Sequence, residues 1–331
     1  MNDRCVIRKS VAGVKTRRQK PKNVAAMVAL TFGLVLVLGR VQAAAPLTTA
    51  PLVTAPPELA HHVDVGGHSL YIKCTGTGSP TVMMEAGYGD ASEVWAEVFS
   101  EVAAFTKVCV YDRAGLGQSD FVEQRTVREV VADIKALIEN CPVAGPLILV
   151  GHSIGSLIVN MVAHEAPEKV AGLVLIDSSH PNQLTRFREH LPQAWLEALD
   201  TFFAGTPGFE TWSSDAATAQ GETLYMRAGS LGSTPLVVLT RDVEHIDPDG
   251  IAWIKENIWD SYSAEVDRLY GQAWLELQRE YLALSTASFH TIVKDSTHYI
   301  QKDRPDAVTG AIRQVVIAAR KRKDTHIAFT R

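Results

Sequence analysis

The chain has 331 residues, of which 46% are apolar and 21% are charged. At roughly 100–200 residues per domain, this length accommodates one large domain or two small ones, with a self-sufficient hydrophobic core. Glycine and proline stand near their average usage and no tract repeats, which excludes collagen-like, mainly disordered and solenoid proteins. No apolar run reaches the ~20 residues of a membrane span, which excludes a polytopic transporter.

The first 45 residues are expected to direct export rather than to belong to the folded domain. Residues 1–23 are strongly basic, residues 24–39 form an uncharged apolar run, and small residues follow. This order of features is typical of a secretory signal peptide. The apolar run has 16 residues, which is short for a membrane span, so cleavage after Ala43 or Ala45 is favoured over a retained inner-membrane anchor. We therefore predict an exported protein, either periplasmic or secreted.

Export changes the charge of the chain. Removal of residues 1–45 takes away nine basic residues and one acidic residue, which lowers the formal net charge from −5 to −13. Because phosphate repels so acidic a protein, we expect no nucleic-acid partner. Contact with a membrane is expected only through an uncleaved N-terminal anchor. The following residues 46–60 begin rich in proline, threonine and alanine, and are predicted to be a flexible linker.

The exported chain would keep three cysteines, Cys74, Cys109 and Cys141. In an oxidising compartment, an odd number permits at most one internal disulfide and leaves one thiol. Cys74 and Cys109 both fall in strand-like segments and are the better pair. The sequence therefore suggests a disulfide between them as a hypothesis.

Strand-like and helical patterns alternate along the first half of the mature chain. Apolar runs and alternation predict strands over residues 61–65, 68–73, 81–85, 107–111, 146–150 and 170–176. Helical spacing predicts helices over residues 94–105, 126–140 and 156–166. Strands that are apolar on both faces and alternate with helices are typical of a mostly parallel sheet covered on both sides.

The alternation is interrupted between residues 181 and 233. This segment is helical and loop-like, which predicts a helical cap inserted into a single domain over residues 61–320. Beyond it we predict strands over residues 236–240 and 289–294, helices over residues 264–284 and 305–320, and a basic tail over residues 321–331. The predicted cap is rich in aromatic residues. They either line an apolar pocket for an acyl or alcohol group or pack against one another within the cap. They are Phe187, Trp195, Phe202, Phe203, Phe209 and Trp212.

A Gly-x-Ser-x-Gly motif carries the chemistry, as Gly151-His-Ser153-Ile-Gly155. It lies between a predicted strand and a predicted helix, where a strained turn can raise a serine above the edge of the sheet. A Cβ at either glycine would collide with the neighbouring strand or helix. The helix dipole favours negative charge at this serine. Ser153 is therefore the candidate nucleophile, and His152 is expected to pack beside it without transferring protons.

A serine hydroxyl needs a base, which in turn needs an acid to orient it. In this topology the acid and then the histidine follow the serine, and the base comes after the last strand, which points to His298. For the acid, Asp177 ends the strand before the cap and is favoured. Asp242 and Glu244, after the next strand, remain alternatives.

Fixed donors must stabilise the oxyanion, and backbone amides suit this role because they do not need to reorganise. One is expected from Ile154, which follows the nucleophile. The other is expected from the loop after the strand over residues 81–85, where Gly87 and Gly89 flank Tyr88 and expose its amide.

Four motifs together resemble the α/β-hydrolase superfamily, and in particular an exported or surface-associated bacterial branch. They are Glu85-Ala-Gly-Tyr-Gly89, Tyr111-Asp-Arg-Ala-Gly-Leu-Gly117, Gly151-His-Ser-Ile-Gly155 and Thr297-His-Tyr299. The resemblance implies Ser153 as nucleophile, His298 as base and the amides of Tyr88 and Ile154 as the oxyanion hole, and it supports Asp177 as the acid. Two positions depart from the pattern: Thr297 and Arg241 each stand where a glycine is usual. The second departure weakens Asp242 and Glu244 as acids.

The resemblance implies an eight-stranded α/β-hydrolase fold and a carboxylesterase-like enzyme with a small-molecule ester substrate and no cofactor. A serine at position 153 argues against haloalkane dehalogenase and epoxide hydrolase chemistry, which this fold performs with an aspartate nucleophile. Perhydrolase and C–C bond hydrolase activities use the same triad and remain alternatives. A ligand-binding protein with little turnover is a further alternative, because a fold does not prove a function.

Overall fold

A computed structural model describes residues 58–122, 126–141, 143, 145–204, 225–244 and 248–329, with only the backbone of residues 202–204 and 323–329. The predicted signal peptide and residues 46–57 of the predicted linker lie outside this description. Among the described residues, no helix has both the length and the apolar character to cross a bilayer.

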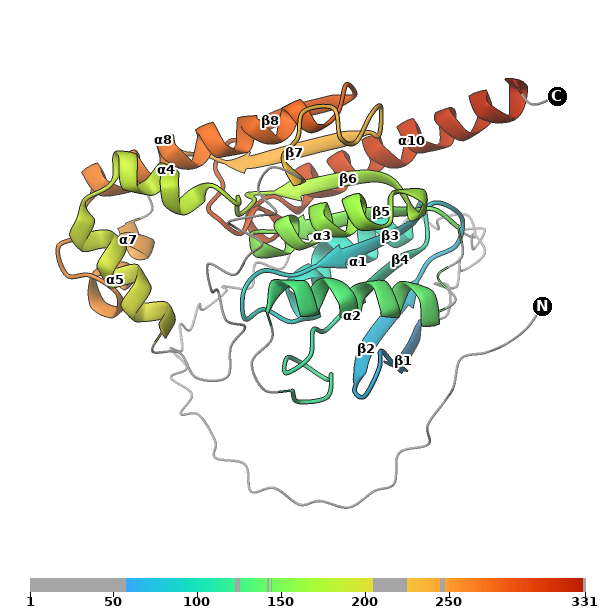
Figure 1. Ribbon diagram of the computed structural model, residues 1–331, viewed down its shortest axis with the longest axis horizontal. Helices are drawn as coiled ribbons and strands as arrows, with labels where there is room; N and C mark the ends of the chain where they lie inside the picture. The colour runs from blue at the N-terminus through green and yellow to red at the C-terminus, as the bar shows by residue number, and fades with distance from the viewer. Residues whose placement is uncertain are drawn as a thin grey trace, which may run out of the picture. The chain divides into compact units, whose positions relative to one another are not determined.

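The predicted mostly parallel sheet is confirmed (Figure 1). Its eight strands in the described chain lie in the order β1-β2-β4-β3-β5-β6-β7-β8. They are β1 (Leu59–Asp64), β2 (Ser69–Thr75), β3 (Thr81–Glu85), β4 (Val108–Tyr111), β5 (Leu147–His152), β6 (Val170–Ile176), β7 (Leu236–Arg241) and β8 (Ser288–Val293). β1 and β2 are antiparallel, and the strands from β4 through β8 run parallel. β3, β4 and β5 are buried along their whole length, as expected of strands covered on both faces.

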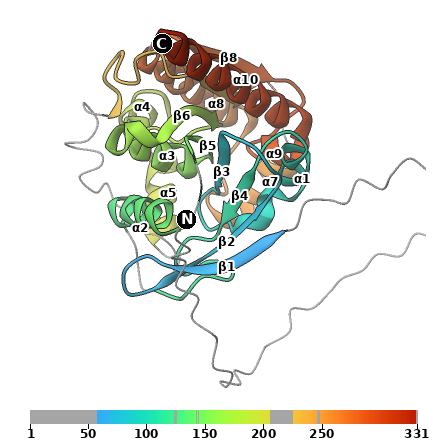
Figure 2. The same cartoon turned by 90° about the vertical axis from the view of Figure 1, so that its right-hand side faces the viewer.

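Helices cover both faces of this sheet. The α-helices are α1 (Ala96–Ala103), α2 (Val127–Asn140), α3 (Ile154–Glu165), α4 (Gln183–His190), α5 (Gln193–Ala204), α7 (Pro248–Asn257), α8 (Ala264–Glu280), α9 (Ile300–Asp303) and α10 (Pro305–Phe329). Short 3₁₀ helices span Ser92–Trp95, Pro167–Lys169 and Tyr281–Leu284. One buried apolar cluster joins α2 and α3 to the sheet, and a second joins α1, α9 and α10 to its other face (Figure 2).

The amphipathic pattern predicted over residues 126–140 forms α2. Thr126 caps this helix, because its side chain accepts a hydrogen bond from the Glu129 backbone while the Glu129 carboxylate accepts one from the Thr126 backbone. Such a capping box stabilises a helix N-terminus. Val130, Val131 and Ile134 then bury the apolar face against the sheet.

The last helix extends further than the sequence pattern predicted. α10 continues to Phe329, through most of the segment interpreted as a basic tail over residues 321–331. No glycine or proline follows Gly310, so nothing in the sequence ends the helix, and lysine, arginine and alanine are good helix formers. Charge alone was therefore a poor guide to the end of this helix.

The cap is built from segments on both sides of β7. Of the predicted insertion over residues 181–233, α4 and α5 are described, while residues 205–224 lie outside the description. Phe187, Leu191 and Trp195 are buried, and they pack with Tyr262 and Trp274. α7, whose first turn follows an acidic loop, was not predicted, yet Ile251 and Ile254 pack against the same cluster.

Two of the cap aromatics belong to the cap's own packing rather than to a substrate pocket. Phe187 contacts the rings of Tyr270 and Trp274, with centroid distances of 4.9 and 6.1 Å. Trp195 contacts Tyr262 at 4.7 Å. The side chains of the other four aromatics, Phe202, Phe203, Phe209 and Trp212, lie outside the description.

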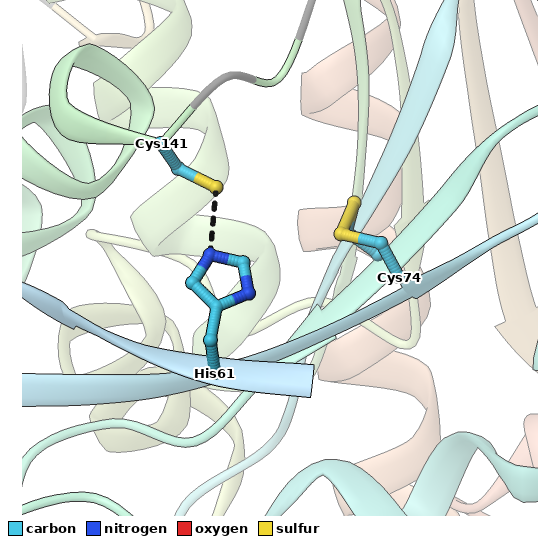
Figure 3. Close-up of a disulfide and its surroundings, with 4 residues drawn as sticks. His61, Cys74 and Cys141 are labelled. Atoms are coloured by element: carbon cyan, nitrogen blue, oxygen red, sulfur yellow. Dashed lines mark hydrogen bonds between the residues drawn. A yellow bond between two sulfur atoms is a disulfide. The ribbon is translucent and has the colours of Figure 1, made fainter. Parts of the chain in front are cut away.

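The hypothesis of a Cys74–Cys109 disulfide is confirmed. The two residues are register partners on the antiparallel strands β2 and β4, with their Cα atoms 4.1 Å apart. Cys141 is a buried thiol outside this disulfide, and its Sγ lies 3.7 Å from His61 Nε2 (Figure 3).

Replacing both bridged cysteines by serine should lower the free energy of unfolding by about 2–4 kcal/mol, because the disulfide constrains a long loop in the unfolded chain. Denaturant unfolding of the double variant Cys74→Ser/Cys109→Ser measures this loss. In the wild type, thiol titration of the denatured, unreduced mature protein should detect only Cys141. Three titratable thiols would contradict the disulfide.

Candidate active site

Ser153 occupies a strained turn between β5 and α3. Its backbone has φ 53° and ψ −121°, a conformation rarely adopted by a non-glycine residue. The turn is sharp because two glycines allow close approach: a Cβ on Gly151 would lie 2.5 Å from the Gly155 backbone, and a Cβ on Gly155 would lie 2.5 Å from the Ala86 carbonyl oxygen. The collisions expected from the motif are thus confirmed.

Backbone hydrogen bonds tie this serine to the segment that carries Asp177. β5 and β6 are neighbouring parallel strands. The Ser153 N–H donates to the Ile176 carbonyl (2.9 Å), and the Ser153 carbonyl accepts from the Ser179 N–H (3.0 Å). The turn that holds the serine and the turn that holds the aspartate are therefore fixed relative to each other by main-chain geometry.

The Asp177 carboxylate is fully buried and accepts hydrogen bonds from four donors. Oδ2 accepts from His298 Nδ1 at 2.6 Å and from Arg241 Nη1 at 3.1 Å. Oδ1 accepts from Trp274 Nε1 at 2.9 Å and from the Arg241 backbone N–H at 3.1 Å. Two donors on each oxygen leave the carboxylate no freedom to rotate.

This environment keeps Asp177 ionised. Burial by itself raises the pKa of the carboxyl group, but the Arg241 guanidinium and the hydrogen bond from His298 outweigh it and lower the pKa to about 2. The charge is stabilised even though the side chain is 0% exposed.

His298 follows β8 in a loop, as predicted, and its side chain is 35% exposed. Because the ionised Asp177 can only accept, Nδ1 of His298 carries the hydrogen and donates it. With the hydrogen on Nδ1, the ring can present Nε2 as a proton acceptor. This is the tautomer that a general base requires.

His152 holds the His298 loop beside the nucleophile. Its Nε2 donates to the His298 carbonyl oxygen at 2.8 Å, and the two rings lie 4.6 Å apart between centroids. Burial and the neighbouring His298 lower the pKa of His152 to about 3, so it stays neutral. The expectation that it packs beside Ser153 is confirmed, and its bond to the His298 backbone is an addition that the sequence did not reveal.

The structure separates the three candidate acids. Asp242 and Glu244 both bind the exposed Lys294 Nζ at 3.1 Å, Asp242 from a buried position and Glu244 from an exposed one, and neither contacts His298. Asp177 alone of the three contacts the imidazole. In the described chain, Ser153 Oγ and His298 Nε2 do not form a hydrogen bond, which is common in enzymes without substrate because catalytic hydrogen bonds tighten on binding.

The two expected oxyanion donors lie on segments in mutual contact. Ile154 is the first residue of α3, so its N–H has no partner within the helix. The loop after β3 packs against the nucleophile turn, since a Cβ on Gly87 would lie 2.8 Å from His152 Nδ1. Tyr88 and Ile154 also pack against the same apolar cluster.

Comparison with known proteins identifies the family. The family described as alpha/beta hydrolase fold matches residues 80–249, which contain the nucleophile turn and Asp177. The chain is a member of the α/β-hydrolase fold family.

Individual relatives of this hydrolase are distant. It is 26% identical over 254 residues to the uncharacterized protein YqjL of Bacillus subtilis, a match that covers 74% of this chain and 86% of that protein. It is 25% identical over 252 residues to a pimeloyl acyl-carrier-protein methyl ester esterase of Sodalis glossinidius, over 70% of this chain and 91% of that protein. The solved haloalkane dehalogenase DatA of Agrobacterium tumefaciens C58 superimposes with a TM-score of 0.54 at 14% identity, covering 79% and 97% of the two chains, and shows the shared fold.

The hydrolase has one site residue that sequence reasoning treated only as a departure from the family pattern. Arg241 ends β7, between the strands that lead to Asp177 and His298, and its side chain is 15% exposed. Its guanidinium lies over the rings of Tyr270 and Trp274 at 5.1 and 5.6 Å. The unusual arginine at a glycine position was the signal available in the sequence. Nothing in the sequence indicated that Trp274 donates a hydrogen bond to Asp177.

Replacing Arg241 by methionine should destabilise the hydrolase by about 3–5 kcal/mol at pH 7, because it leaves the Asp177 charge buried without its cation. In the wild type, the pKa of Asp177 is about 2 when folded, below its ordinary value of 3.8, so ionised Asp177 contributes stability above about pH 4 that is lost as the pH falls towards 2. In the variant, the guanidinium no longer opposes the effect of burial, so that pKa is higher than in the wild type, although the hydrogen bond from His298 remains.

The difference in unfolding free energy between wild type and Arg241→Met should therefore shrink as the pH falls below about 4. Urea unfolding followed from pH 7 to pH 3 measures it. Arg241→Lys, which keeps the positive charge, should lose less stability. A difference between wild type and Arg241→Met that stays constant over this pH range would contradict the role of the Arg241–Asp177 pair.

Proposed function

We propose that this enzyme is a serine hydrolase that cleaves carboxylic esters through an acyl-enzyme intermediate. One observation carries the proposal above all. A serine in a strained strand-to-helix turn is tied by backbone hydrogen bonds to the segment that carries a buried carboxylate, and that carboxylate accepts the Nδ1 hydrogen of an imidazole, which leaves Nε2 as a general base. This arrangement suits nucleophilic acyl transfer.

In the proposed mechanism, Ser153 Oγ attacks the ester carbonyl carbon while His298 Nε2 takes the hydroxyl proton. The amides of Tyr88 and Ile154 stabilise the negative oxygen of the tetrahedral intermediate. His298 then gives the proton to the leaving alcohol, which departs as the C–O bond breaks. Water attacks the acyl-enzyme in the same way and releases the acid, and Asp177 stabilises the imidazolium in both steps.

The nucleophile type separates this enzyme from some of its relatives. The chain is 22% identical over 305 residues to epoxide hydrolase 4 of Mus musculus, which covers 79% of this chain and 81% of that protein. A serine at position 153 favours the acyl-enzyme route over the aspartate route of epoxide and haloalkane hydrolysis. The methyl ester esterase relative adds support for an ester substrate.

We further propose that the enzyme acts outside the cytoplasm, in the periplasm or as a secreted protein. The basic and apolar segments at the N-terminus support export. The disulfide between β2 and β4 supports an oxidising compartment, because cytosolic thiols are kept reduced. N-terminal sequencing of the exported protein tests the cleavage after Ala43 or Ala45 against retention of residues 24–39 as an anchor.

Hydrolysis of a series of p-nitrophenyl acyl esters tests the proposed reaction. The wild type should release p-nitrophenol, and Ser153→Ala should lower kcat by at least about 10³-fold with an unchanged melting temperature. Ser100→Ala, which changes an exposed serine on α1, should retain full activity. Either of two results would refute the proposal. One is hydrolysis that survives Ser153→Ala. The other is a wild-type protein that binds the esters but hydrolyses none of them.

A further inference from the structure

The guanidinium of Arg113 is buried beneath the loop that follows β3. Arg113 lies just after β4, and its side chain is 2% exposed. It binds the last residue of β3 and the first two residues of that loop. Nη1 donates to the Glu85 carboxylate and, at 2.8 Å, to the Ala86 carbonyl, while Nη2 donates to the Gly87 carbonyl at 2.6 Å.

The Gly87 carbonyl and the Tyr88 N–H belong to the same peptide unit. A trans peptide unit is planar, so its C=O and its N–H point in opposite directions. The hydrogen bond from Arg113 to the carbonyl therefore fixes the plane and directs the N–H away from the guanidinium. The bond to the Ala86 carbonyl fixes the preceding peptide unit as well, and the Asp90 N–H donates to the Gly87 carbonyl at 3.2 Å.

This peptide lies against the turn that carries the nucleophile. A Cβ on Gly87 would be 2.8 Å from Nδ1 of His152, the residue before Ser153. A Cβ on Gly155 would be 2.5 Å from the Ala86 carbonyl oxygen, which Arg113 also binds. A rotation of the loop peptides would therefore change the position of the Tyr88 amide relative to Ser153.

We propose that Arg113 is a positioning residue of the oxyanion hole, which aims the Tyr88 N–H and strengthens it as a donor by binding the carbonyl of the same peptide. This inference rests on the proposed function. A cationic donor on the carbonyl oxygen polarises the peptide and makes its N–H a better hydrogen-bond donor. Since the amide is held before the substrate arrives, it stabilises the developing oxyanion without reorganising.

Lysine cannot replace arginine in this role. The planar guanidinium offers several N–H donors in a fixed fork, so it can bind two carbonyls and a carboxylate together. A lysine at position 113 would keep the charge opposite Glu85 but lose the fixed geometry at the two carbonyls. The variant Arg113→Lys thus removes the effect of Arg113 on the orientation of the loop but keeps a positive charge opposite Glu85.

The test compares Arg113→Lys with Glu85→Gln, which weakens the other contact of the guanidinium and leaves both carbonyl bonds in place. For p-nitrophenyl ester hydrolysis, Arg113→Lys should lower kcat by about 10–100-fold with KM changed less than about 3-fold. The inhibition constant of a trifluoromethyl ketone, which adds to Ser153 as an oxyanion, should rise by a similar factor. Glu85→Gln should keep kcat within about 3-fold, even with a lower melting temperature.

Three results would overturn the inference. The first is a kcat of Arg113→Lys within about 3-fold of the wild type. The second is an equal loss of kcat in Glu85→Gln, and the third is a loss of kcat in Arg113→Lys with unchanged affinity for the trifluoromethyl ketone. The last two would indicate general destabilisation. If Arg113→Lys does not fold, the uncharged double variant Arg113→Gln/Glu85→Gln is expected to show the same loss of kcat and of ketone affinity, and normal values in it would equally overturn the inference.

Failure of this inference is distinguishable from failure of the proposed function. If the wild type has no hydrolytic activity that depends on Ser153, the proposed function itself is wrong. If that activity is present and Arg113→Lys retains it, only the role of Arg113 is wrong.

Discussion

Replacing His298 by glutamine should lower kcat for ester hydrolysis by about 10⁴–10⁶-fold, the largest effect expected of any single substitution outside Ser153. Glutamine retains a hydrogen-bonding side chain but cannot take the serine proton at neutral pH. Without the base, Ser153 remains a weak nucleophile, and only the oxyanion donors and substrate binding accelerate the reaction. Release of p-nitrophenol by the purified variant, with its melting temperature as a check of folding, measures the loss.

His290→Gln is the matched control for this substitution. His290 lies on β8, the strand that leads to His298, and its Nε2 lies 2.8 Å from Thr240 Oγ1. This control should keep kcat within about 3-fold of the wild type. An equal loss in both variants, or His298→Gln activity above about 1% of the wild type, would show that His298 is not the base.

Replacing Asp177 by asparagine should lower kcat by about 10³–10⁴-fold. An asparagine amide does not force the hydrogen of His298 onto Nδ1, so the ring can adopt the tautomer that lacks an acceptor at Nε2. The substitution also removes the negative charge that stabilises the imidazolium. It further leaves the buried Arg241 without its anion, so the melting temperature should fall together with kcat.

The other two candidate acids, near β7, provide the controls for Asp177. Asp242→Asn and Glu244→Gln each remove a contact with Lys294 and none with His298. Both should keep kcat within about 3-fold. Glu244→Gln should change stability by less than about 1 kcal/mol, as expected of an exposed ion pair. Asp242→Asn should cost more stability, because Asp242 is buried and also accepts from the Glu244 and Asp295 backbone. A loss of more than about 100-fold in Glu244→Gln, with Asp177→Asn still active, would transfer the role of the acid to Glu244.

Much of the fold was predictable because apolar residues recur with different periods in its strands and its helices. The strands over residues 81–85 and 170–176 were predicted with the observed bounds, since a buried parallel strand is a short apolar run ended by polar or glycine residues. α7 was missed for two reasons. It follows an acidic segment of the sequence, and only part of the helix packs against the cap cluster. The cluster that it joins includes residues of α4, α5 and α8, so no local pattern reveals the contact.

The candidate nucleophile and base followed from local motifs and chain order, whereas for the acid the sequence favoured Asp177 but left Asp242 and Glu244 as alternatives. Asp177 and Asp242 each directly follow a parallel strand, so both are carried to the same edge of the sheet. Arg241 decides between them in the folded protein. Its guanidinium and backbone N–H both bind Asp177, while Asp242 binds Lys294 near the surface. Such a choice depends on side-chain packing between strands, which the sequence does not encode locally.

The same limit applies to Arg113. In the sequence it is only part of the Tyr111–Gly117 motif, in which the Asp112 carboxylate accepts from the Ser92 and Gln118 backbone amides. The bonds from Arg113 to the loop after β3 span 26–28 positions of the chain. They became visible only when the neighbouring strands β3 and β4 were paired in space.

The most direct test of the whole account is the site at which a fluorophosphonate attaches to the mature protein. Peptide mass spectrometry after stoichiometric labelling should find a single adduct, on Ser153. Ser153→Ala should take up no label, and His298→Gln should be labelled far more slowly than the wild type. An adduct on a different residue, or labelling of Ser153→Ala at the wild-type rate, would contradict the assignment of Ser153 as the nucleophile.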